Sequence, residues 1–374
     1  MFVLVGWADS GKKETWSGTP SGLLCGLQNS VNCPKLINVI NYKNFVLNPL
    51  LKIVKLFSKL FSIDDCGLFD CKLETMFANA CIDRESMPVI AFDENHSKFI
   101  EDTYLFLDCS VDFAYRVFLK KDSIISKFVP LNKDRSFSLI SRRWKYANYA
   151  YDRCKGIFTM GQWAADELVE KGGLSAKKVH CVGGGVNVDQ NLVNVRRKNG
   201  RRFLFVGKDF ERKNGPLVVE AFAKLNAEHG NEYELYIAGP REWPLSGEIP
   251  SNIHFLGLKT SDELVEFYNL CDVFVMPSIF EAYGLVFAEA LVFGLPVIGR
   301  DAFAMKDFVR PGDNGYLLKT NSVEELARLM YSAISDEEMR GRVISRREEY
   351  VARYSWDAVA RRIINVMRDD GYEV

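Results

Sequence analysis

The sequence predicts an α/β protein built from two doubly wound parallel-sheet domains in series. Short apolar runs alternate with segments of helical periodicity along most of the chain. The runs are apolar throughout, as expected for strands that are covered on both faces. The length of 374 residues suits two domains of about 150–200 residues each. Such sheets bind ligands at the carboxyl ends of their strands, and two of them in one chain predict a cleft between domains.

The first half of the chain alternates strand and helix less regularly than the second half. Its expected strands are residues 2–5, 36–40, 89–92, 104–107, 157–159 and 179–182. Its expected helices are residues 21–29, 50–61, 111–119, 138–153 and 162–170.

The second half gives the clearer pattern. Its expected strands are residues 203–206, 234–238, 253–256, 273–276, 295–298 and 316–318. Helical periodicity between and after them is clearest over residues 216–228, 261–270 and 323–334. The boundary between the halves is expected within residues 186–200, which are rich in Asn and end in a short basic run.

Composition excludes several classes of protein. A net charge of −1 argues against a dedicated nucleic-acid binder. Four His and the absence of close Cys pairs argue against a zinc scaffold. The nine Cys are odd in number and irregularly spaced, which indicates reduced thiols and a cytoplasmic protein. The first residues do not resemble a signal peptide, and no apolar run is long enough to span a membrane.

The most specific signal lies in residues 277–291, where a strand is followed by the start of a helix. Glu281 falls in the loop before the helix, and Glu289 falls inside the helix. The backbone amides of residues 283–285 would point out of the helix N-terminus, an arrangement that suits a diphosphate. The two carboxylates would accept hydrogen bonds from sugar and ribose hydroxyls. The alternative is that both are ordinary acids near a helix start.

A second signal lies in residues 205–215, where a strand, a Gly turn at Gly207 and a basic cluster precede a helix. Lys208 and Lys213 would neutralise the same diphosphate through charge-assisted hydrogen bonds. The alternative is that they are solvated loop lysines.

Together these motifs resemble the donor-binding domain of the retaining nucleotide-sugar glycosyltransferases of the GT-B fold, in the large group numbered family four. The resemblance rests on Glu281 and Glu289 eight residues apart and on Gly207 followed by Arg212-Lys213. It also rests on residues 255–257, 288–297 and 312–315. It covers residues 155–365 well and the rest of the chain more weakly.

The resemblance implies a GT-B architecture with two facing Rossmann-like domains. Residues 1–190 would form the acceptor-binding domain and residues 191–355 the nucleotide-sugar domain. Residues 356–374 would form a helix that crosses back to the first domain.

The resemblance also implies roles for individual residues. Lys213 and Lys208 would contact the diphosphate, Glu289 the ribose, and Glu281 the hexose hydroxyls. The residues Ala282, Tyr283, Gly284 and Leu285 would bind sugar and phosphate. The sugar would be transferred with retention by front-face attack, in which the leaving diphosphate takes the acceptor's proton.

Two departures from the family pattern are visible. Many members have Arg at the position of Lys208. Many have a His near the reaction centre, where this chain has Asp108, with His96 as a nearby alternative. Asp108 is therefore the first-domain candidate for catalysis, although it would also suit a cap for the helix at residue 111. Gly18 lies in the loop expected near donor phosphates and acceptor, where a plain turn is the alternative.

The sequence thus predicts a cytoplasmic glycosyltransferase without cofactor or metal, since no Asp-x-Asp occurs. It would move a hexose from an NDP-sugar, with UDP expected, to a glycan or lipid-linked acceptor. The alternatives are an NDP-sugar epimerase or hydrolase and a non-catalytic subunit of a glycan-assembly complex. Residues 50–61 would contact a membrane surface peripherally through Lys52, Lys55 and Lys59. The alternative is a core helix with one solvent-exposed face.

Overall fold

The computed structural model divides the chain into two compact units. Unit 1 comprises Met1–Gly185 and Trp356–Val374, and unit 2 comprises Val186–Ser355. The structure describes residues 1–5, 15–31, 34–38, 88–92, 94, 102–120, 124–128, 137–194, 200–230 and 232–374. The expected helix at residues 50–61 and His96 lie outside this set.

Unit 1 holds a parallel sheet in the order β2-β1-β3-β4-β5-β6 over its described residues. Its strands are β1 (Phe2–Val5), β2 (Lys35–Asn38), β3 (Val89–Ala91), β4 (Thr103–Leu107), β5 (Gly156–Thr159) and β6 (Val179–Cys181). The central strands β3, β4 and β5 are buried along their whole length. The sheet is therefore covered on both faces, as the apolar runs predict.

The structure also describes helices and turns among the residues of unit 1 that it covers. They are the 3₁₀ turn η1 (Thr15–Gly18), α1 (Thr19–Gln28), α6 (Val111–Leu119), η3 (Ile124–Lys127), α7 (Phe137–Arg153), α8 (Gln162–Asp166), the π-helical turn η4 (Glu167–Lys171), η5 (Ala176–Lys178) and α16 (Trp356–Asp369). The expected helix at residues 162–170 is therefore one irregular element, α8 continued by η4.

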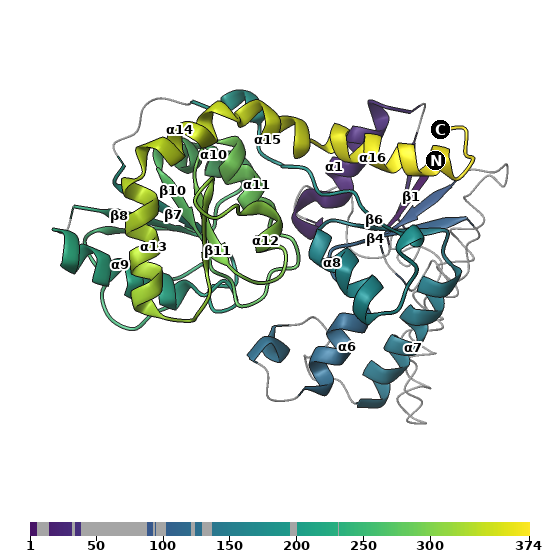
Figure 1. Cartoon of the computed structure of the whole chain (residues 1–374), viewed down its shortest axis with the longest axis horizontal. Coiled ribbons are helices and arrows are strands. Elements are labelled where there is room, and N and C mark those ends of the chain that lie inside the picture. The colour runs from purple at the N-terminus through teal and green to yellow at the C-terminus, as the bar shows by residue number, and fades with distance from the viewer. Residues whose placement is uncertain are drawn as a thin grey trace, which may run out of the picture. The chain divides into compact units, whose positions relative to one another are not determined.

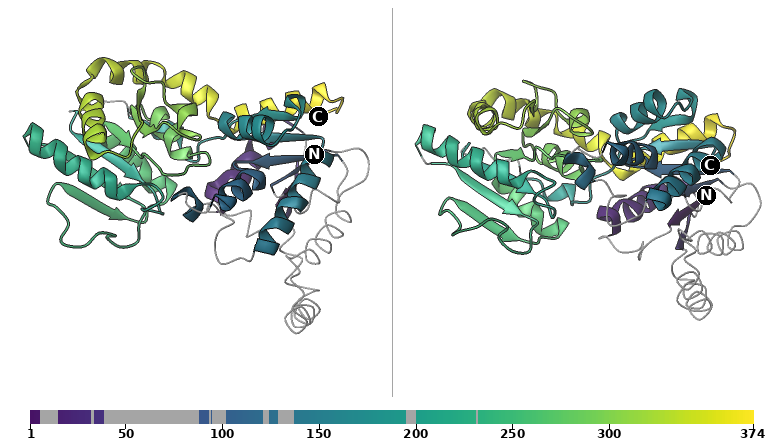
Figure 2. Two further views of the ribbon diagram at one scale, coloured as in Figure 1. Left: turned by 60° about the horizontal axis from the view of Figure 1, so that its bottom comes forward. Right: turned by 90° about the horizontal axis from the view of Figure 1, so that it is seen from below.

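Helix α16 joins unit 1 from the far end of the sequence and lies beside α1 (Figures 1 and 2). Gly22 and Gly26, one turn apart on α1, allow this approach, since a Cβ on either would lie within 2.5 Å of Trp356. Asn29 at the end of α1 donates a hydrogen bond to Asp357 at 3.0 Å. The small residues on α1 thus create the contact surface for α16.

Unit 2 holds a second parallel sheet, in the order β12-β11-β10-β7-β8-β9. Its strands are β7 (Arg202–Val206), β8 (Glu234–Ala238), β9 (Ile253–Gly257), β10 (Val273–Val275), β11 (Val297–Arg300) and β12 (Gly315–Leu318). In sequence order from the β9 edge this is the 3-2-1-4-5-6 arrangement of a Rossmann sheet. The order reverses between β7 and β10, which are neighbours in the sheet.

The helical elements of unit 2 surround this sheet (Figure 1). They are η6 (Gln190–Leu192), α9 (Gly215–His229), α10 (Ser261–Leu270), α11 (Leu285–Val292), α12 (Met305–Phe308), α13 (Val323–Ser335), α14 (Glu337–Ser345) and α15 (Arg347–Arg353). Local chemistry sets their ends. Thr260 and Glu263 form a capping box at the start of α10, and Ser322 caps α13.

The chain enters and leaves unit 2 at neighbouring points. The amide of Val186 donates a hydrogen bond to the carbonyl of Tyr354 at 2.8 Å. The sequence predicts domain boundaries at 190/191 and 355/356. In the structure the chain passes from one unit to the other at 185/186 and 355/356.

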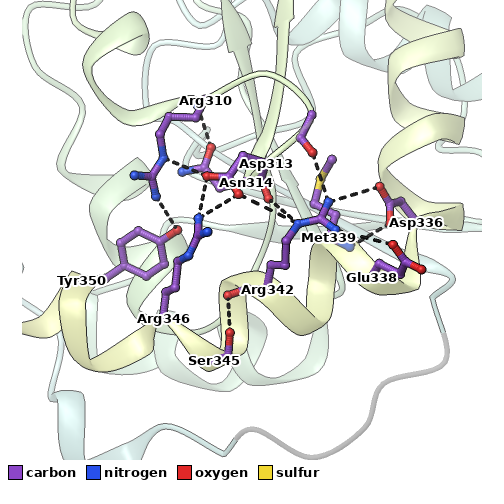
Figure 3. A network of polar contacts seen from close by, with 11 residues as sticks. Arg310, Asp313, Asn314, Asp336, Glu338, Met339, Arg342, Ser345, Arg346 and Tyr350 are labelled. Carbon is purple, nitrogen blue, oxygen red and sulfur yellow. Dashed lines mark hydrogen bonds and ion pairs between the residues drawn. The ribbon is translucent and has the colours of Figure 1, made fainter.

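A polar network fixes the turn before β12 to α14 and α15 (Figure 3). Asp313 accepts hydrogen bonds from Arg346 and pairs with Arg310 at 3.0 Å. Asn314 lies beside it and is only 1% exposed. Its Oδ1 accepts from the Arg310 amide at 2.7 Å, and its Nδ2 donates to the Phe308 carbonyl at 3.0 Å.

Asn314→Ala should lower the free energy of unfolding by about 1–3 kcal/mol, because it removes the side-chain partner of the Arg310 amide and of the buried Phe308 carbonyl. Urea unfolding of the purified protein would measure this change. The control is Glu338→Ala in the same network. The Glu338 side chain is 91% exposed, so its removal should leave the free energy of unfolding unchanged. Equal midpoints for the two variants would contradict the assignment.

Candidate functional site

The candidate site of unit 2 forms where the strand order of the sheet reverses. The loops after β7 and β10 leave the same edge of the sheet, because both strands run parallel and are neighbours. Close packing of backbone shapes this edge. A Cβ on Gly207 would lie 2.6 Å from Cγ of Lys213, and a Cβ on Gly239 would lie 2.3 Å from the carbonyl carbon of Gly207. The Gly turn expected after β7 is therefore required by the lysine side chain that packs over it.

Lys213 and Glu281 meet at this edge as a buried ion pair. Lys213 is 8% exposed and Glu281 is 6% exposed. The Lys213 Nζ donates to Glu281 Oε2, and the Ser278 hydroxyl donates to the same oxygen at 3.3 Å. Burial lowers the pKa of Lys213, and the charge of Glu281 opposes that shift. The pair is thus a charged centre held out of water.

Backbone bonds fasten the two loops to one another. The amide of Ile279 donates to the carbonyl of Arg212 at 2.8 Å. The Arg212 Nη1 donates to the carbonyl of Phe280 at 2.8 Å and lies 3.7 Å from Glu281 Oε2. Asn214, in a left-handed conformation at the start of α9, donates to the Pro277 carbonyl at 3.3 Å. The position of Glu281 therefore depends on the loop that carries Lys213.

The four residues predicted to bind sugar and phosphate lead from Glu281 into α11. Gly284, with φ of 93°, precedes the helix, which begins without a side-chain cap or an acidic residue in its first turn. A Cβ on Gly284 would lie 3.0 Å from Cγ of Glu281. Tyr283 is buried and packs edge-on against Phe308. Ala282 and Leu285 are partly exposed. The partial positive charge of the helix start faces no acidic side chain of its own first turn.

Glu289 lies one turn into α11 and has partners that the sequence did not indicate. It is 5% exposed and accepts a hydrogen bond from the Tyr268 hydroxyl at 2.9 Å. Its other oxygen lies 3.5 Å from the Asn187 amide. Burial raises the pKa of Glu289, and these two donors only partly oppose the shift. The role of this buried carboxyl in accepting ribose hydroxyls remains a prediction.

Lys208 does not join the buried pair. It lies directly after the Gly turn at residue 207 and is exposed. The structure therefore brings together Lys213, Glu281 and the residues 282–285, while Lys208 lies at the solvent side of the same loop.

The two first-domain candidates lie in unit 1. Asp108 follows β4 and accepts a hydrogen bond from the Trp16 indole at 3.1 Å. It does not cap α6, because Ser110 does so by accepting from the Phe113 amide at 3.0 Å. Gly18 precedes α1 in a left-handed conformation, directly after Trp16 and Ser17, which are also left-handed. Trp16 and Asp108 thus form one small cluster at the carboxyl edge of this sheet.

Sequence reasoning missed several polar residues around the buried pair. Arg300 ends β11 and donates to the carbonyls of Ser278 at 3.0 Å and Pro277 at 3.4 Å. Asn321 follows β12 and accepts from Arg300 at 2.6 Å and from Asn214 at 3.0 Å. The available signal was positional, since a polar residue directly after a buried parallel strand lies at the ligand edge of the sheet.

No group of three or more His, Cys, Asp and Glu residues in the described part of the chain is arranged to hold a metal ion. Within the same part, no helix is long and apolar enough to cross a membrane.

Comparison with solved structures identifies the fold. The lipopolysaccharide outer core galactosyltransferase WaaB superposes with a TM-score of 0.62 at 16% identity, over 99% of each chain. Anabaena HepE, solved with UDP and glucose, superposes with a TM-score of 0.64 at 13% identity, over 98% of this chain and 99% of its own. The class that the two parallel sheets define is therefore the GT-B fold, as the sequence predicted.

Comparison with sequences relates part of the chain to one family. Residues 190–350 match the family model of the glycosyl transferases group 1. The Escherichia coli serotype-specific mannosyltransferase WbdA is 25% identical over 301 residues, which are 74% of this chain and 36% of WbdA. The phosphatidyl-myo-inositol mannosyltransferase of Mycolicibacterium smegmatis is 27% identical over 183 residues, 48% of this chain and 47% of that enzyme. The chain thus spans about a third of the length of WbdA and about half of the length of the second relative. The buried Lys213–Glu281 pair lies within the segment 190–350 that matches this family model.

Proposed function

We propose that this protein is a retaining glycosyltransferase that moves a hexose from a nucleoside diphosphate sugar to a hydroxyl of a glycan or lipid-linked acceptor, without a metal ion. The observation that carries the proposal is the buried Lys213–Glu281 pair at the reversal point of the unit 2 sheet, next to the start of α11. This edge is where Rossmann sheets bind nucleotides. The family match of residues 190–350 and the GT-B fold support the same conclusion.

The residues supply complementary charges for such a donor. Lys213 and the amides at the start of α11 stabilise the negative charge that develops on the leaving diphosphate. Glu281 accepts hydrogen bonds from hexose hydroxyls, and Glu289 accepts them from the ribose. In the transfer, the bond between the anomeric carbon and the phosphate oxygen breaks on the face where the acceptor oxygen bonds. The acceptor proton passes to the leaving diphosphate.

The donor base and sugar are proposed from the neighbours. HepE was solved with UDP and glucose, and one structure of TarM was solved with UDP. We propose UDP as the nucleotide on this ground. The two curated relatives reported above are named mannosyltransferases, so mannose belongs in the donor panel.

Unit 1 is proposed to bind the acceptor, with Asp108 and Gly18 at its carboxyl edge. Asp108 would contact the transferred sugar or orient the acceptor hydroxyl. The Trp16 indole beside it adds an apolar surface on which a sugar ring can pack.

The deciding experiment is a thermal-shift and turnover screen with UDP, GDP, ADP and their glucose, galactose and mannose conjugates, with EDTA present. A ligand at 100 times its Kd should stabilise unit 2 by about 2.7 kcal/mol. We expect one nucleotide to give a shift that Lys213→Ala abolishes and that Lys224→Ala, on α9 and paired with Glu228, retains. Retention is read from the anomeric coupling constant of the product by NMR.

Three outcomes would replace the proposal. Donor hydrolysis or isomerisation independent of any acceptor would assign an NDP-sugar hydrolase or epimerase. Nucleotide binding with no turnover in any condition would assign a non-catalytic subunit. Activity that EDTA abolishes and a divalent cation restores would contradict the metal-free mechanism.

A further inference from the structure

We infer that Arg300 is a positioning residue for the donor site, acting together with Asn321 and Asn214 on the loop that carries Glu281. The inference rests on the proposed function, and it concerns Arg300 and Asn321, which lie outside the motifs described above, together with Asn214 at the end of the second motif. It follows from a chain of hydrogen bonds that joins the segments after β7, β10, β11 and β12.

Arg300 spans the loop after β10. Its Nε donates to the Ser278 carbonyl at 3.0 Å and its Nη2 to the Pro277 carbonyl at 3.4 Å. Pro277 and Ser278 follow the end of β10 by two and three positions and precede Glu281 by four and three positions. A guanidinium fork can hold two adjacent carbonyls at once, which a lysine ammonium on a flexible stem does less well.

Asn321 closes the chain of bonds. Its Oδ1 accepts from Arg300 Nη2 at 2.6 Å and from Asn214 Nδ2 at 3.0 Å. Asn214 is 6% exposed, directly follows Lys213 and donates also to the Pro277 carbonyl. Lys213 is therefore linked to this chain of bonds through its neighbour Asn214, and Glu281 is linked to it through Ser278, whose hydroxyl donates to Glu281 Oε2 and whose carbonyl accepts from Arg300.

Two features distinguish Arg300 from an ordinary surface arginine. No carboxylate lies within ion-pair distance of it among the described residues, so its bonds are to neutral oxygens. Its side chain is partly buried, and this desolvation lowers the pKa of Arg300. A cation placed in this way with neutral acceptors is expensive to bury, which indicates that its geometry serves the site.

The experiment measures UDP and GDP binding by calorimetry for the wild type and for Arg300→Lys, Arg300→Gln and Asn321→Ala. We expect the Kd of the bound nucleotide to rise about tenfold in each variant, because misplacing a contact by about 1 Å has effects of this size or larger. Asn321 is exposed, so its variant should fold even where the arginine variants do not. The control is Arg340→Lys, whose side chain is 13% exposed and donates to the Ile334 carbonyl of unit 2 outside these loops.

A double-mutant cycle separates positioning from general stability. In a Lys213→Met background, Arg300→Gln should change the Kd by less than twofold, since the contact that it positions is already lost. Arg340→Lys should leave the Kd unchanged in both backgrounds.

Kd values within twofold of wild type in Arg300→Lys and Asn321→Ala would overturn the inference. Fully additive effects of Arg300→Gln and Lys213→Met would also overturn it. A wild-type protein that binds neither UDP nor GDP would instead overturn the proposed donor site. The variants alone test only the role of Arg300, so this outcome is distinguishable from a failure of the inference.

Discussion

Glu281→Leu is expected to reduce both stability and transfer, for separate reasons. Without the carboxylate, the Lys213 ammonium stays buried and unpaired, which should lower the free energy of unfolding by about 3–5 kcal/mol. Loss of the hexose contact should lower the transfer rate at least ~100-fold. Urea unfolding and initial rates with the identified donor measure the two effects.

The double variant Lys213→Met/Glu281→Leu separates them. It removes both charges and fills the space with apolar atoms, so it should recover more than half of the lost stability. It should remain as inactive as the single variant, because the diphosphate contact is gone as well.

The control for this pair is Glu228→Leu on α9, since Glu228 is exposed and pairs with Lys224 at 3.0 Å. Its unfolding midpoint should match the wild type, as surface ion pairs contribute little. A Glu281→Leu protein as stable as the wild type would show that the pair is not buried in solution. Recovery of activity in the double variant would contradict the catalytic assignment.

Glu289→Gln is expected to stabilise the protein at neutral pH while weakening donor binding. Burial raises the pKa of Glu289 above its ordinary value of 4.5. The folded state therefore holds more protons than the unfolded state between that value and the raised one. Stability is lost as the pH rises through this window, and the penalty persists above it.

Glutamine removes the charge and keeps the shape. Its amide oxygen can accept from the Asn187 amide, and its NH₂ can donate to the Tyr268 hydroxyl, which serves as acceptor as well as donor. The gain in unfolding free energy should be present at pH 7–8 and vanish near pH 4. The donor KM should rise about 10–100-fold, the value of one charged hydrogen bond to ribose.

Denaturant titrations at pH 4, 6 and 8 test the stability effect, with Glu266→Gln on the exposed face of α10 as the matched control. A gain that is the same at all three pH values would refute the linkage to Glu289 ionisation. An unchanged donor KM would refute the ribose contact.

The local patterns of the sequence were sufficient for the fold. The apolar runs and the spacing of turn residues predicted the strands of both sheets to within a few residues, and the GT-B comparison confirms the class. The apolar periodicity did not predict where the helical backbone becomes irregular. The π-helical turn after α8 carries the same periodic signal as a regular helix.

The candidate site was predicted in part. The motifs identified Lys213, Glu281 and Glu289 as candidates, and the structure places the first two in one pair. Their roles toward a donor remain predictions. Partners distant in sequence, such as Tyr268 for Glu289 or Arg300 for Ser278, leave no local pattern, because each contact is made by packing of separate strands and helices.

The return of α16 to α1 has a consequence for biosynthesis. Unit 2 is one continuous segment, whereas the last helix of unit 1 is made only after all of unit 2. Domains tend to fold in the order in which they are synthesised. Unit 2 can therefore complete its sheet before Trp356 packs against Gly22 and Gly26 of α1. The contact surface of α1 for α16 can therefore be covered only when residues 356–374 have been synthesised, so these residues complete unit 1 last.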